Sequence, residues 1–340
     1  MDKTLKKTSG EAKLRRMARH DLDAVVGIDA ALMGRSRRDY FERRLSAALR
    51  EPPLHLQFAL EQGPGLAGYV LARRMEGEFG RVEPAFRIEV INVIADAQGR
   101  GIGSQLLDAI ESEAKRQGVR ELRTQAAWRN HGMLRFLDHA GFELGRSQVV
   151  DCVAHGGRIV EGEEERIPAP EHRRTTAELD YSAPPANDYE ALARDRHDVR
   201  SLASGDVGNI VRIDRRITGR DRTAYITRLV SEALNDSAIR VSLAAYRDGS
   251  VSGFIMAKVD FGDFGRTEPV AVIDTIGVDP GFAGSGIGTA LLSQLFVNLE
   301  ALHVERIETV IARENFDLLG FFYRAGFGPS QRLGFVKRLG

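Results

Sequence analysis

The 340-residue chain has a single cysteine, Cys152, and no excess of charge of either sign. One cysteine cannot form an intrachain disulfide, and it excludes a cysteine-based metal cluster, so we expect no metal site. The 48 Lys and Arg residues balance the 48 Asp and Glu residues. This balance argues against partners bound by charge alone, such as nucleic acid or a membrane surface.

Long hydrophobic stretches are also missing. The sequence contains no apolar run of 18 or more residues and no signal-peptide hydrophobic segment, so a cytoplasmic protein is the default expectation. The composition, 43% apolar and 28% charged, is that of an ordinary globular protein, and the length suits two domains.

The chain carries one pattern twice. Gly101, Ile102 and Gly103 reappear 185 residues later as Gly286, Ile287 and Gly288. At the same offset "GEFGRVEP" matches "GDFGRTEP", and two "AGF" tripeptides match each other. We therefore predict two copies of one domain, 15–153 and 199–340, preceded by a disordered tail, 1–14. A segment rich in Pro, Gly and charge, 154–198, would link them.

Each copy has the hydrophobic pattern of an α/β domain. A short strand and two helices are followed by three strands, and a glycine loop then opens a further helix. Another strand and a helix ending at glycine come next. The strands "RSQVVDCV" (146–153) and "SQRLGFVKRL" (330–339) are expected to close the sheet of their own copy.

The glycine-rich stretch "DAQGRGIGSQLLDAI" (96–110) stands directly before a helical pattern. Glycines in this place let an anion approach the free N–H groups of a helix N-terminus. A phosphate-binding P-loop would need a lysine after Gly103, and a dinucleotide fingerprint would need a different glycine spacing. The stretch does match a pyrophosphate loop written [Q/R]-x-x-G-x-[G/A], through Gln98, Gly101 and Gly103. A plain strand-to-helix turn is the alternative.

Three features in a fixed order, present in both copies, make the chain resemble the GNAT acetyltransferases. The loop follows a strand that ends at Val93 or Val278. An asparagine, Asn130 or Asn315, follows the next strand, and a Gly-Phe pair comes eleven residues after it. The resemblance covers nearly the whole chain apart from the tail and the linker.

This resemblance implies an α/β fold of the GNAT type, with two tandem copies of a mixed, splayed central sheet flanked by helices. The pantetheine arm of coenzyme A would lie in the splay. The implied activity is transfer of an acetyl group from acetyl-CoA to a primary amine by direct attack. The implied partners are acetyl-CoA and an amine acceptor, without nucleic acid or membrane. A catalytically silent acyl-CoA-binding or regulatory protein is the alternative.

The resemblance also implies a set of cofactor-binding residues in each copy. In the first copy they are Val93, Gln98, Gly99, Arg100, Gly101, Ile102, Gly103 and Asn130. In the second they are Val278, Ala283, Gly284, Ser285, Gly286, Ile287, Gly288 and Asn315. We expect the first loop to bind more tightly, because Gln98 and Arg100 offer polar contacts that Ala283 and Ser285 lack.

Glu89 and Asp274 are the candidate general bases. Each stands on an apolar strand four residues before the valine of the motif, and strand alternation would place it on that valine's face. An isolated carboxylate there is costly unless it is paired or functional. A salt bridge to an arginine of the first helices, such as Arg35 or Arg220, is the alternative. Glu83 and Glu268 are the second choices for the general base. For them the alternative is a solvated carboxylate in a turn.

Many GNAT members carry a tyrosine seven residues after the motif asparagine, where it protonates the leaving thiolate. Here those positions hold Leu137 and Phe322. Tyr323 is the remaining candidate for a catalytic acid, but it comes one residue late, about 100° around the helix. A half-buried core tyrosine is the alternative, in which case the proton comes from water or is not needed.

Overall fold

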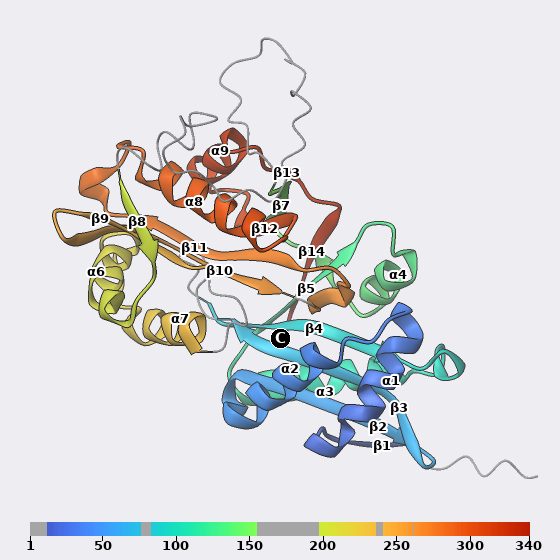
Figure 1. The fold of residues 1–340 in the computed structure, drawn as a ribbon. Coiled ribbons are helices and arrows are strands. Elements are labelled where there is room, and N and C mark those ends of the chain that lie inside the picture. Colours follow the sequence, from blue (N-terminus) through green and yellow to red (C-terminus); the bar gives the residue numbers. More distant parts are fainter. Residues whose placement is uncertain (1–11, 76–82, 155–196, 236–240, 261) are drawn as a thin grey trace, which may run out of the picture. The chain divides into compact units, whose positions relative to one another are not determined.

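The computed structural model describes residues 12–75, 83–154, 197–235, 241–260 and 262–340. The chain forms two compact units (Figure 1). Unit 1 comprises Met1–Val149, Asp260–Pro269 and Ser330–Gly340, and unit 2 comprises Val150–Val259 and Val270–Pro329. Most of the expected tail and linker lies outside the described residues, and the expected domain boundaries stay a prediction.

Unit 1 contains a mixed seven-stranded sheet with the order β1-β2-β3-β4-β5-β14-β6. Its strands are β1 (Lys13–Arg16), β2 (His55–Gln62), β3 (Gly65–Met75), β4 (Ala85–Val93), β5 (Glu121–Ala127), β6 (Glu143–Leu144) and β14 (Arg332–Arg338). Its helices are α1 (Leu22–Met33), α2 (Arg38–Arg50), α3 (Ile102–Arg116) and α4 (His131–His139). Neighbouring strands are antiparallel except β4 and β5, which are parallel.

Unit 2 contains a second seven-stranded sheet with the order β13-β7-β12-β11-β10-β9-β8. Its strands are β7 (Ser147–Val153), β8 (Asp198–Ser201), β9 (Leu243–Arg247), β10 (Ser250–Asp260), β11 (Val270–Val278), β12 (Arg306–Ala312) and β13 (Gly328–Pro329). Its helices are α6 (Val207–Thr218), α7 (Thr223–Asn235), α8 (Ile287–Ala301) and α9 (Phe316–Arg324). Here β11 and β12 are parallel. The predicted fold class, two mixed sheets flanked by helices, is confirmed.

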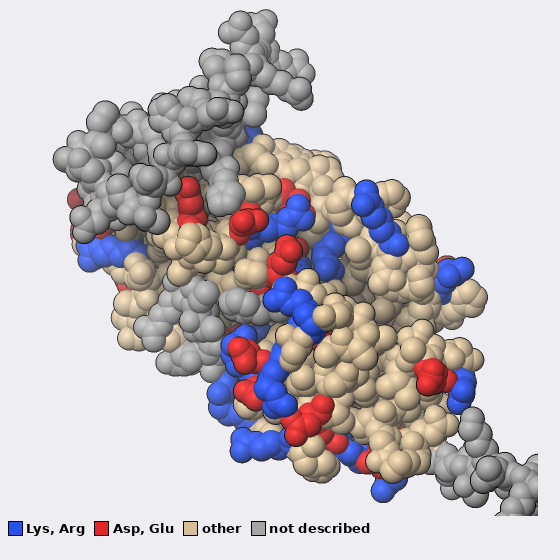
Figure 2. Space-filling model, turned by 45° about the vertical axis from the view of Figure 1, so that its right-hand side comes forward, with Lys and Arg blue, Asp and Glu red and all other residues tan. Residues whose placement is uncertain are grey.

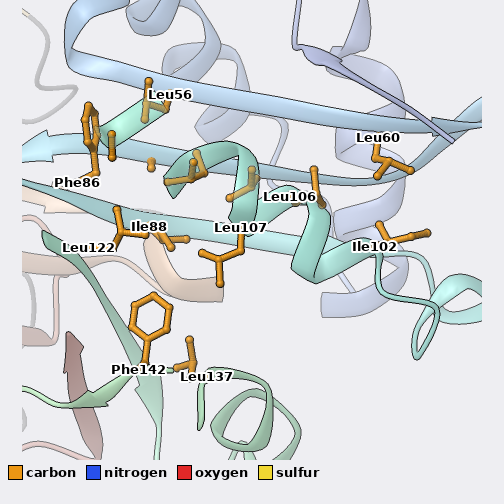
Figure 3. Close-up of a cluster of buried hydrophobic side chains, with 14 of the residues drawn as sticks. Leu56, Leu60, Phe86, Ile88, Ile102, Leu106, Leu107, Leu122, Leu137 and Phe142 are labelled. Atoms are coloured by element: carbon orange, nitrogen blue, oxygen red, sulfur yellow. The ribbon is translucent and has the colours of Figure 1, made fainter. Parts of the chain in front are cut away.

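Helices cover both faces of the unit 1 sheet. The buried side chains of α3 recur at helical spacing, as Ile102, Leu106 and Ile110 do, and they belong to one core cluster with residues of β2, β3 and β4. Figure 3 shows Ile102 and Leu106 in this cluster. Full burial of each such side chain contributes about 1.5–3 kcal/mol to folding. The opposite face packs on α1 and α2 through residues such as Phe41 and Leu45. One face of β4 therefore packs on α3, and the other face packs on α1 and α2.

The parallel strands of each unit pair only over their first residues. In unit 1 the register of β4 on β5 covers Phe86 and Arg87, and the Thr124 hydroxyl donates to the carbonyl of Ile88 at 3.0 Å. In unit 2 the β11–β12 register ends at Ile273, whose carbonyl accepts from the Thr309 hydroxyl at 3.0 Å. We call the parts beyond these threonines the β4–β5 splay and the β11–β12 splay.

The closing strands lie in the opposite sheets from those we expected. β14 comes from the second copy but pairs along its whole length with β5 and also with β6, both from the first copy. β7 comes from the first copy and lies between β12 and β13 of unit 2. The two strands are equivalent in the repeat, so either one presents a suitable pattern to either sheet. Hydrophobic periodicity within one copy cannot tell which sheet receives which strand.

Two surface properties bear on the expected partners. Among the described helices, none is both long enough and apolar enough to cross a membrane. On the face shown in Figure 2, basic and acidic side chains are interspersed, and neither sign forms an extended patch. This distribution agrees with the balanced formal charge of the sequence.

Candidate functional site

Both glycine loops turn through left-handed backbone conformations just before a helix. Gly99 and Gly101 have φ of 75° and 77°, and Gly101 is the N-cap of α3. Gly284 and Gly286 repeat this before α8, with φ of 75° and 87°. Glycine is favoured at such angles. A Cβ built on Gly101 would meet no heavy atom within 4 Å, so the loop backbone is accessible beside the free N–H groups of α3.

The third glycine of each loop has a different role. A Cβ on Gly103 would lie 3.0 Å from the ring of Phe136 in α4, and one on Gly288 would lie 3.4 Å from the ring of Phe321 in α9. These glycines let an aromatic ring pack closely against the helix that follows the loop. Their predicted role in cofactor binding stays a prediction, but close packing already accounts for the residue type.

The first loop carries polar side chains that face solvent. Gln98 is exposed and its amide nitrogen donates to the carbonyl of Val93 at 3.1 Å. Arg100 is also exposed, and no ion pair joins it to any residue within the described ranges. Its guanidinium is therefore available to an anion. Val93 is half-buried against the α3 side of the core, and Ile102 is buried in it.

The second loop is anchored instead by a buried carboxylate. Asp279 accepts from the backbone N–H of Gly281 at 3.0 Å and forms ion pairs with Arg216 at 2.7 Å and Arg212 at 3.1 Å. The Gly281 hydrogen bond and these guanidiniums lower the pKa of Asp279. Sequence reasoning did not single out Asp279, although it stands at the start of the second glycine cluster. Its counterpart in the first copy is apolar Ile94.

The remaining residues of the second loop are mostly exposed. Ala283, Gly284 and Ser285 are exposed, and the Ser285 hydroxyl donates to the carbonyl of Phe282 at 2.6 Å. Ile287 is buried under the loop, as Ile102 is in unit 1. Val278, at the end of β11, is half-buried. The loop therefore keeps an accessible backbone, without a charged side chain of its own.

The two motif asparagines begin helices. The Asn130 side-chain oxygen accepts from the N–H of Met133 at 3.1 Å, which caps α4. Asn315 caps α9 in the same way, by accepting from Leu318 at 3.2 Å. N-capping by asparagine is worth about 1 kcal/mol. A structural role therefore accounts for both asparagines, and their predicted contact with the cofactor stays a prediction.

A β-bulge places Glu89 on the face opposite to the one we expected. Ala72 and Leu71 are neighbours on β3, but they pair with Ile88 and Val90 on β4, so Glu89 is the extra residue. Simple alternation would put Glu89 on the face of Val93, beside α3. Instead it forms an ion pair with Arg44, which belongs to α2 on the other face. The expectation from alternation was wrong because the bulge shifts the strand by one residue.

Glu89 is almost completely buried and is held by two guanidiniums. Its carboxylate contacts Nε of Arg44 and lies 3.0 Å from Arg87, with 3% of the residue exposed. Burial alone would raise the pKa of Glu89, but the charges of Arg44, Arg87 and Arg73 outweigh it and lower the pKa. The salt-bridge alternative thus applies to this residue, and the arginine of the first helices that forms it is Arg44 on α2, not the example Arg35. Its role as a base stays a prediction that these ion pairs oppose.

The same arginine contacts a buried histidine. Arg44 faces Nδ1 of His55, which is 7% exposed, so the neutral ring accepts the guanidinium hydrogen bond. Burial, together with the charges of Arg44, Arg73 and Arg50, lowers the pKa of His55 to about 2. Sequence reasoning missed His55, because nothing in its strand pattern distinguishes it from a solvated histidine.

We expect His55 to make unit 1 acid-sensitive. Between pH 6.5 and 2 the unfolded chain protonates this histidine while the folded unit does not, so stability falls as the pH falls below 6.5. The slope for one group is about 1.4 kcal/mol per pH unit. Urea unfolding followed by the fluorescence of Trp128, the only tryptophan, should give a shallower slope for His55→Gln between pH 6.5 and 4.5. Equal slopes in both proteins would contradict a buried neutral His55.

Asp274, the counterpart of Glu89, has a simpler environment. It lies on β11 directly after Ile273, where pairing with β12 ends. Within the described ranges its one ion pair is with Lys258, at 3.6 Å from Nζ to Oδ2. The positions equivalent to Arg44 and Arg87 hold Leu229 and Val272 in the second copy. Asp274 is therefore a carboxylate at a splay without guanidiniums at those two positions.

The positions of the usual family tyrosine are filled by core residues. Leu137 and Phe322 are 2% and 0% exposed, so neither reaches a ligand. Tyr323 is 40% exposed at its neighbouring position on α9, and is neither buried nor half-buried. Its role as an acid stays a prediction. The second-choice carboxylates, Glu83 and Glu268, are exposed, as expected for solvated turn residues.

Both copies match the same known protein family. The family model described as the acetyltransferase (GNAT) family matches the chain twice, at residues 23–142 and 210–327. The chain belongs to the GNAT family. Membership supports N-acetyl transfer from an acyl-CoA as the kind of function, and the two matches confirm a tandem member. No protein with a curated description matches the sequence.

Several solved GNAT structures share the fold of the whole chain. A tandem GNAT protein from the clavulanic acid biosynthesis pathway is 18% identical, with 97% of this chain and 99% of that chain covered and a TM-score of 0.61. A GCN5-related N-acetyltransferase from Sphaerobacter thermophilus is 16% identical, with 96% of each chain covered and a TM-score of 0.57. At these identities the likeness concerns the fold.

A third similar structure belongs to a much longer protein. It is the glucosamine N-acetyltransferase region of a fungal multi-domain GH3 β-N-acetylglucosaminidase, with 13% identity and a TM-score of 0.62. The match covers 96% of this chain but only 38% of the fungal chain.

Proposed function

We propose that this GNAT protein transfers an acetyl group from acetyl-CoA to a primary amine, and that the transfer takes place in unit 2. The observation that carries the proposal is the position of Asp274 at the β11–β12 splay, with one ammonium partner 3.6 Å away. Glu89, its counterpart in unit 1, is held by two guanidiniums.

The residues of both units fit acetyl-CoA. Each helix that follows a glycine loop begins at a left-handed glycine, Gly101 or Gly286, and free N–H groups at such a terminus favour a pyrophosphate. Each splay leaves part of a central strand unpaired on one side, which suits the amide groups of a pantetheine arm. Bound there, acetyl-CoA supplies an activated acetyl group, which the amine takes as the C–S bond breaks.

The protein's own part is to position the amine and to accept its proton. A general base must keep a free carboxylate oxygen within hydrogen-bond reach of the amine or of a bridging water. Asp274 meets this requirement better than Glu89, because its ion pair with Lys258 involves one carboxylate oxygen, at a distance of 3.6 Å. Tyr323 is exposed on α9, so water is the simplest proton source for the leaving thiolate.

The test is thiol release from acetyl-CoA with a panel of primary amines, comprising polyamines, amino acids, aminosugars and lysine peptides. We expect amine-dependent release with at least one class. Thermal shifts measured with acetyl-CoA, ATP and NAD side by side should show stabilisation by acetyl-CoA. Binding of acetyl-CoA without release for any amine would favour the silent acyl-CoA-binding alternative. Stabilisation by ATP or NAD alone would contradict both the proposed acetyl transfer and the silent acyl-CoA-binding alternative.

A further inference from the structure

A short segment of the second copy is built into unit 1. Arg37 of the first copy, at the start of α2, donates to the carbonyl oxygens of Gly262 and Arg266, the latter at 3.1 Å. Gly262 lies flat on the ring of Tyr40, because a Cβ there would come within 2.5 Å of a ring carbon. Asp260–Pro269 belongs to unit 1 by its contacts. We call residues 262–266 the inserted segment.

The inserted segment reaches the charged groups around Glu89. Asp263 accepts from the Tyr40 hydroxyl at 2.8 Å and lies 3.0 Å from Arg87. The same Arg87 guanidinium also lies 3.0 Å from the Glu89 carboxylate. Asp263, Tyr40 and Glu89 are 7%, 7% and 3% exposed. The segment and the β4–β5 splay thus share one buried network of ion pairs and hydrogen bonds.

Phe264 holds the segment in a strained conformation. Its φ is 56°, in the left-handed region that a bulky side chain rarely adopts. Three guanidiniums surround its ring, those of Arg87 and Arg266 at 5.5 Å and that of Arg332 at 5.8 Å from the centroid. Such strain persists only where the surroundings hold the residue in place. The segment is therefore fixed from several sides.

The segment lies on the face of the sheet from which an amine would approach. The glycine loop opens α3, which covers one face of β4. Glu89 points to the other face, toward Arg44 of α2, and the inserted segment contacts α2 through Tyr40. An acyl-CoA held by the loop would enter from the α3 face. An amine directed at Glu89 would have to enter from the face that the segment occupies.

We propose that the inserted segment closes the acceptor end of the β4–β5 splay in unit 1. Unit 1 then takes a coenzyme A thioester with a small acyl group but admits no amine beside it. This inference rests on the proposed function for the position of the pantetheine arm. It assigns to a piece of the second copy, centred on Asp263 and Phe264, the control of what the first copy can bind.

Coenzyme A thioethers of different length test the closure without any need to know the amine. Calorimetric titration of S-methyl-CoA and S-hexyl-CoA into the full-length Gly286→Asp variant, whose second loop is blocked, should report on unit 1. We expect S-hexyl-CoA to bind at least tenfold more weakly than S-methyl-CoA. Adding Phe264→Gly, which removes the ring and relieves the left-handed strain, should reduce this difference to less than threefold.

The control is Asp248→Gly in the same background. Asp248 also has a positive φ, of 51°, but lies on the β9–β10 turn of unit 2. The Asp248→Gly substitution should leave the discrimination between the two thioethers intact. Circular dichroism should show that all variants are folded. If Phe264→Gly proves unstable, Phe264→Asn, which also tolerates this φ, removes the ring instead.

Three results would overturn the closure. They are equal binding of the two thioethers before Phe264 is changed, unchanged discrimination after it is changed, and no binding of either thioether to unit 1. The proposed function fails separately, by an absence of amine-dependent thiol release from the wild type. The binding measurements require no turnover, so the two failures are distinguishable.

Discussion

Asp274→Asn is expected to lower the rate of acetyl transfer by ~10²–10⁴-fold, the usual range for loss of a general base. The amide keeps the shape of the carboxylate but cannot accept the amine proton. Affinity for acetyl-CoA should change little, because the side chain belongs to β11 and not to the glycine loop that follows the strand. Steady-state kinetics with the best amine of the panel, together with calorimetric titration of acetyl-CoA, separates the two effects.

Glu89→Gln is the matched control for this prediction. It makes the same change at the equivalent position, but in a cluster with Arg44 and Arg87. Loss of one partner from a buried ion pair typically costs about 3–5 kcal/mol of stability. We therefore expect Glu89→Gln to destabilise unit 1 and to leave turnover per folded molecule nearly unchanged. A large loss of turnover in Glu89→Gln with full activity in Asp274→Asn would place the chemistry in unit 1 instead.

Gly101→Asp is expected to remove the tighter of two acetyl-CoA binding events. Aspartate tolerates the left-handed φ of this position better than most residues, and a Cβ there meets no protein atom within 4 Å. The added carboxylate would repel a pyrophosphate at the N-terminus of α3. We expect the first loop to be the tighter site because Arg100 is exposed and free of ion pairs among described residues. A charge-assisted contact is worth about 1.5–3 kcal/mol, or roughly tenfold or more in affinity.

Gly101→Asn separates charge from shape in this experiment, since it adds the same number of heavy atoms without the charge. The affinity of Gly101→Asn for acetyl-CoA should be at least tenfold higher than that of Gly101→Asp. Gly286→Asp and Gly286→Asn provide the same comparison for the second loop. If calorimetry shows the tightest event intact in Gly101→Asp and lost in Gly286→Asp, the second loop is the principal cofactor site and our ranking is wrong.

The sequence predicted the elements well because the information for them is local. Helical spacing in α3 and α8, alternation in the strands and the left-handed glycines before each helix depend on neighbouring residues. The repeat doubled this information, since a pattern seen in one copy supported its counterpart in the other. The order of these elements along the chain follows the prediction in both copies for this reason, although each closing strand joins the sheet of the other unit.

The environment of Glu89 could not be predicted in the same way. One extra residue in β4 changes the face of the side chain, and no residue type marks that bulge in the sequence. Its partners Arg44 and Arg87, and through Arg87 also Asp263, come from three separate stretches of chain. Such pairings depend on tertiary packing. Alignment of the two copies at the 185-residue offset does show one difference between them, because Leu229 and Val272 replace Arg44 and Arg87 in the second copy.

The exchange of β7 and β14 also affects when each sheet can be completed during translation. β14 is made last among the elements described here, yet it fills the place between β5 and β6 in the unit that begins first. On the ribosome, β5 therefore waits with an open edge until residues 332–338 emerge, about 200 residues after its own synthesis. At ~5–20 residues per second, that wait lasts on the order of ten seconds or more, during which the nascent first half depends on protection from aggregation.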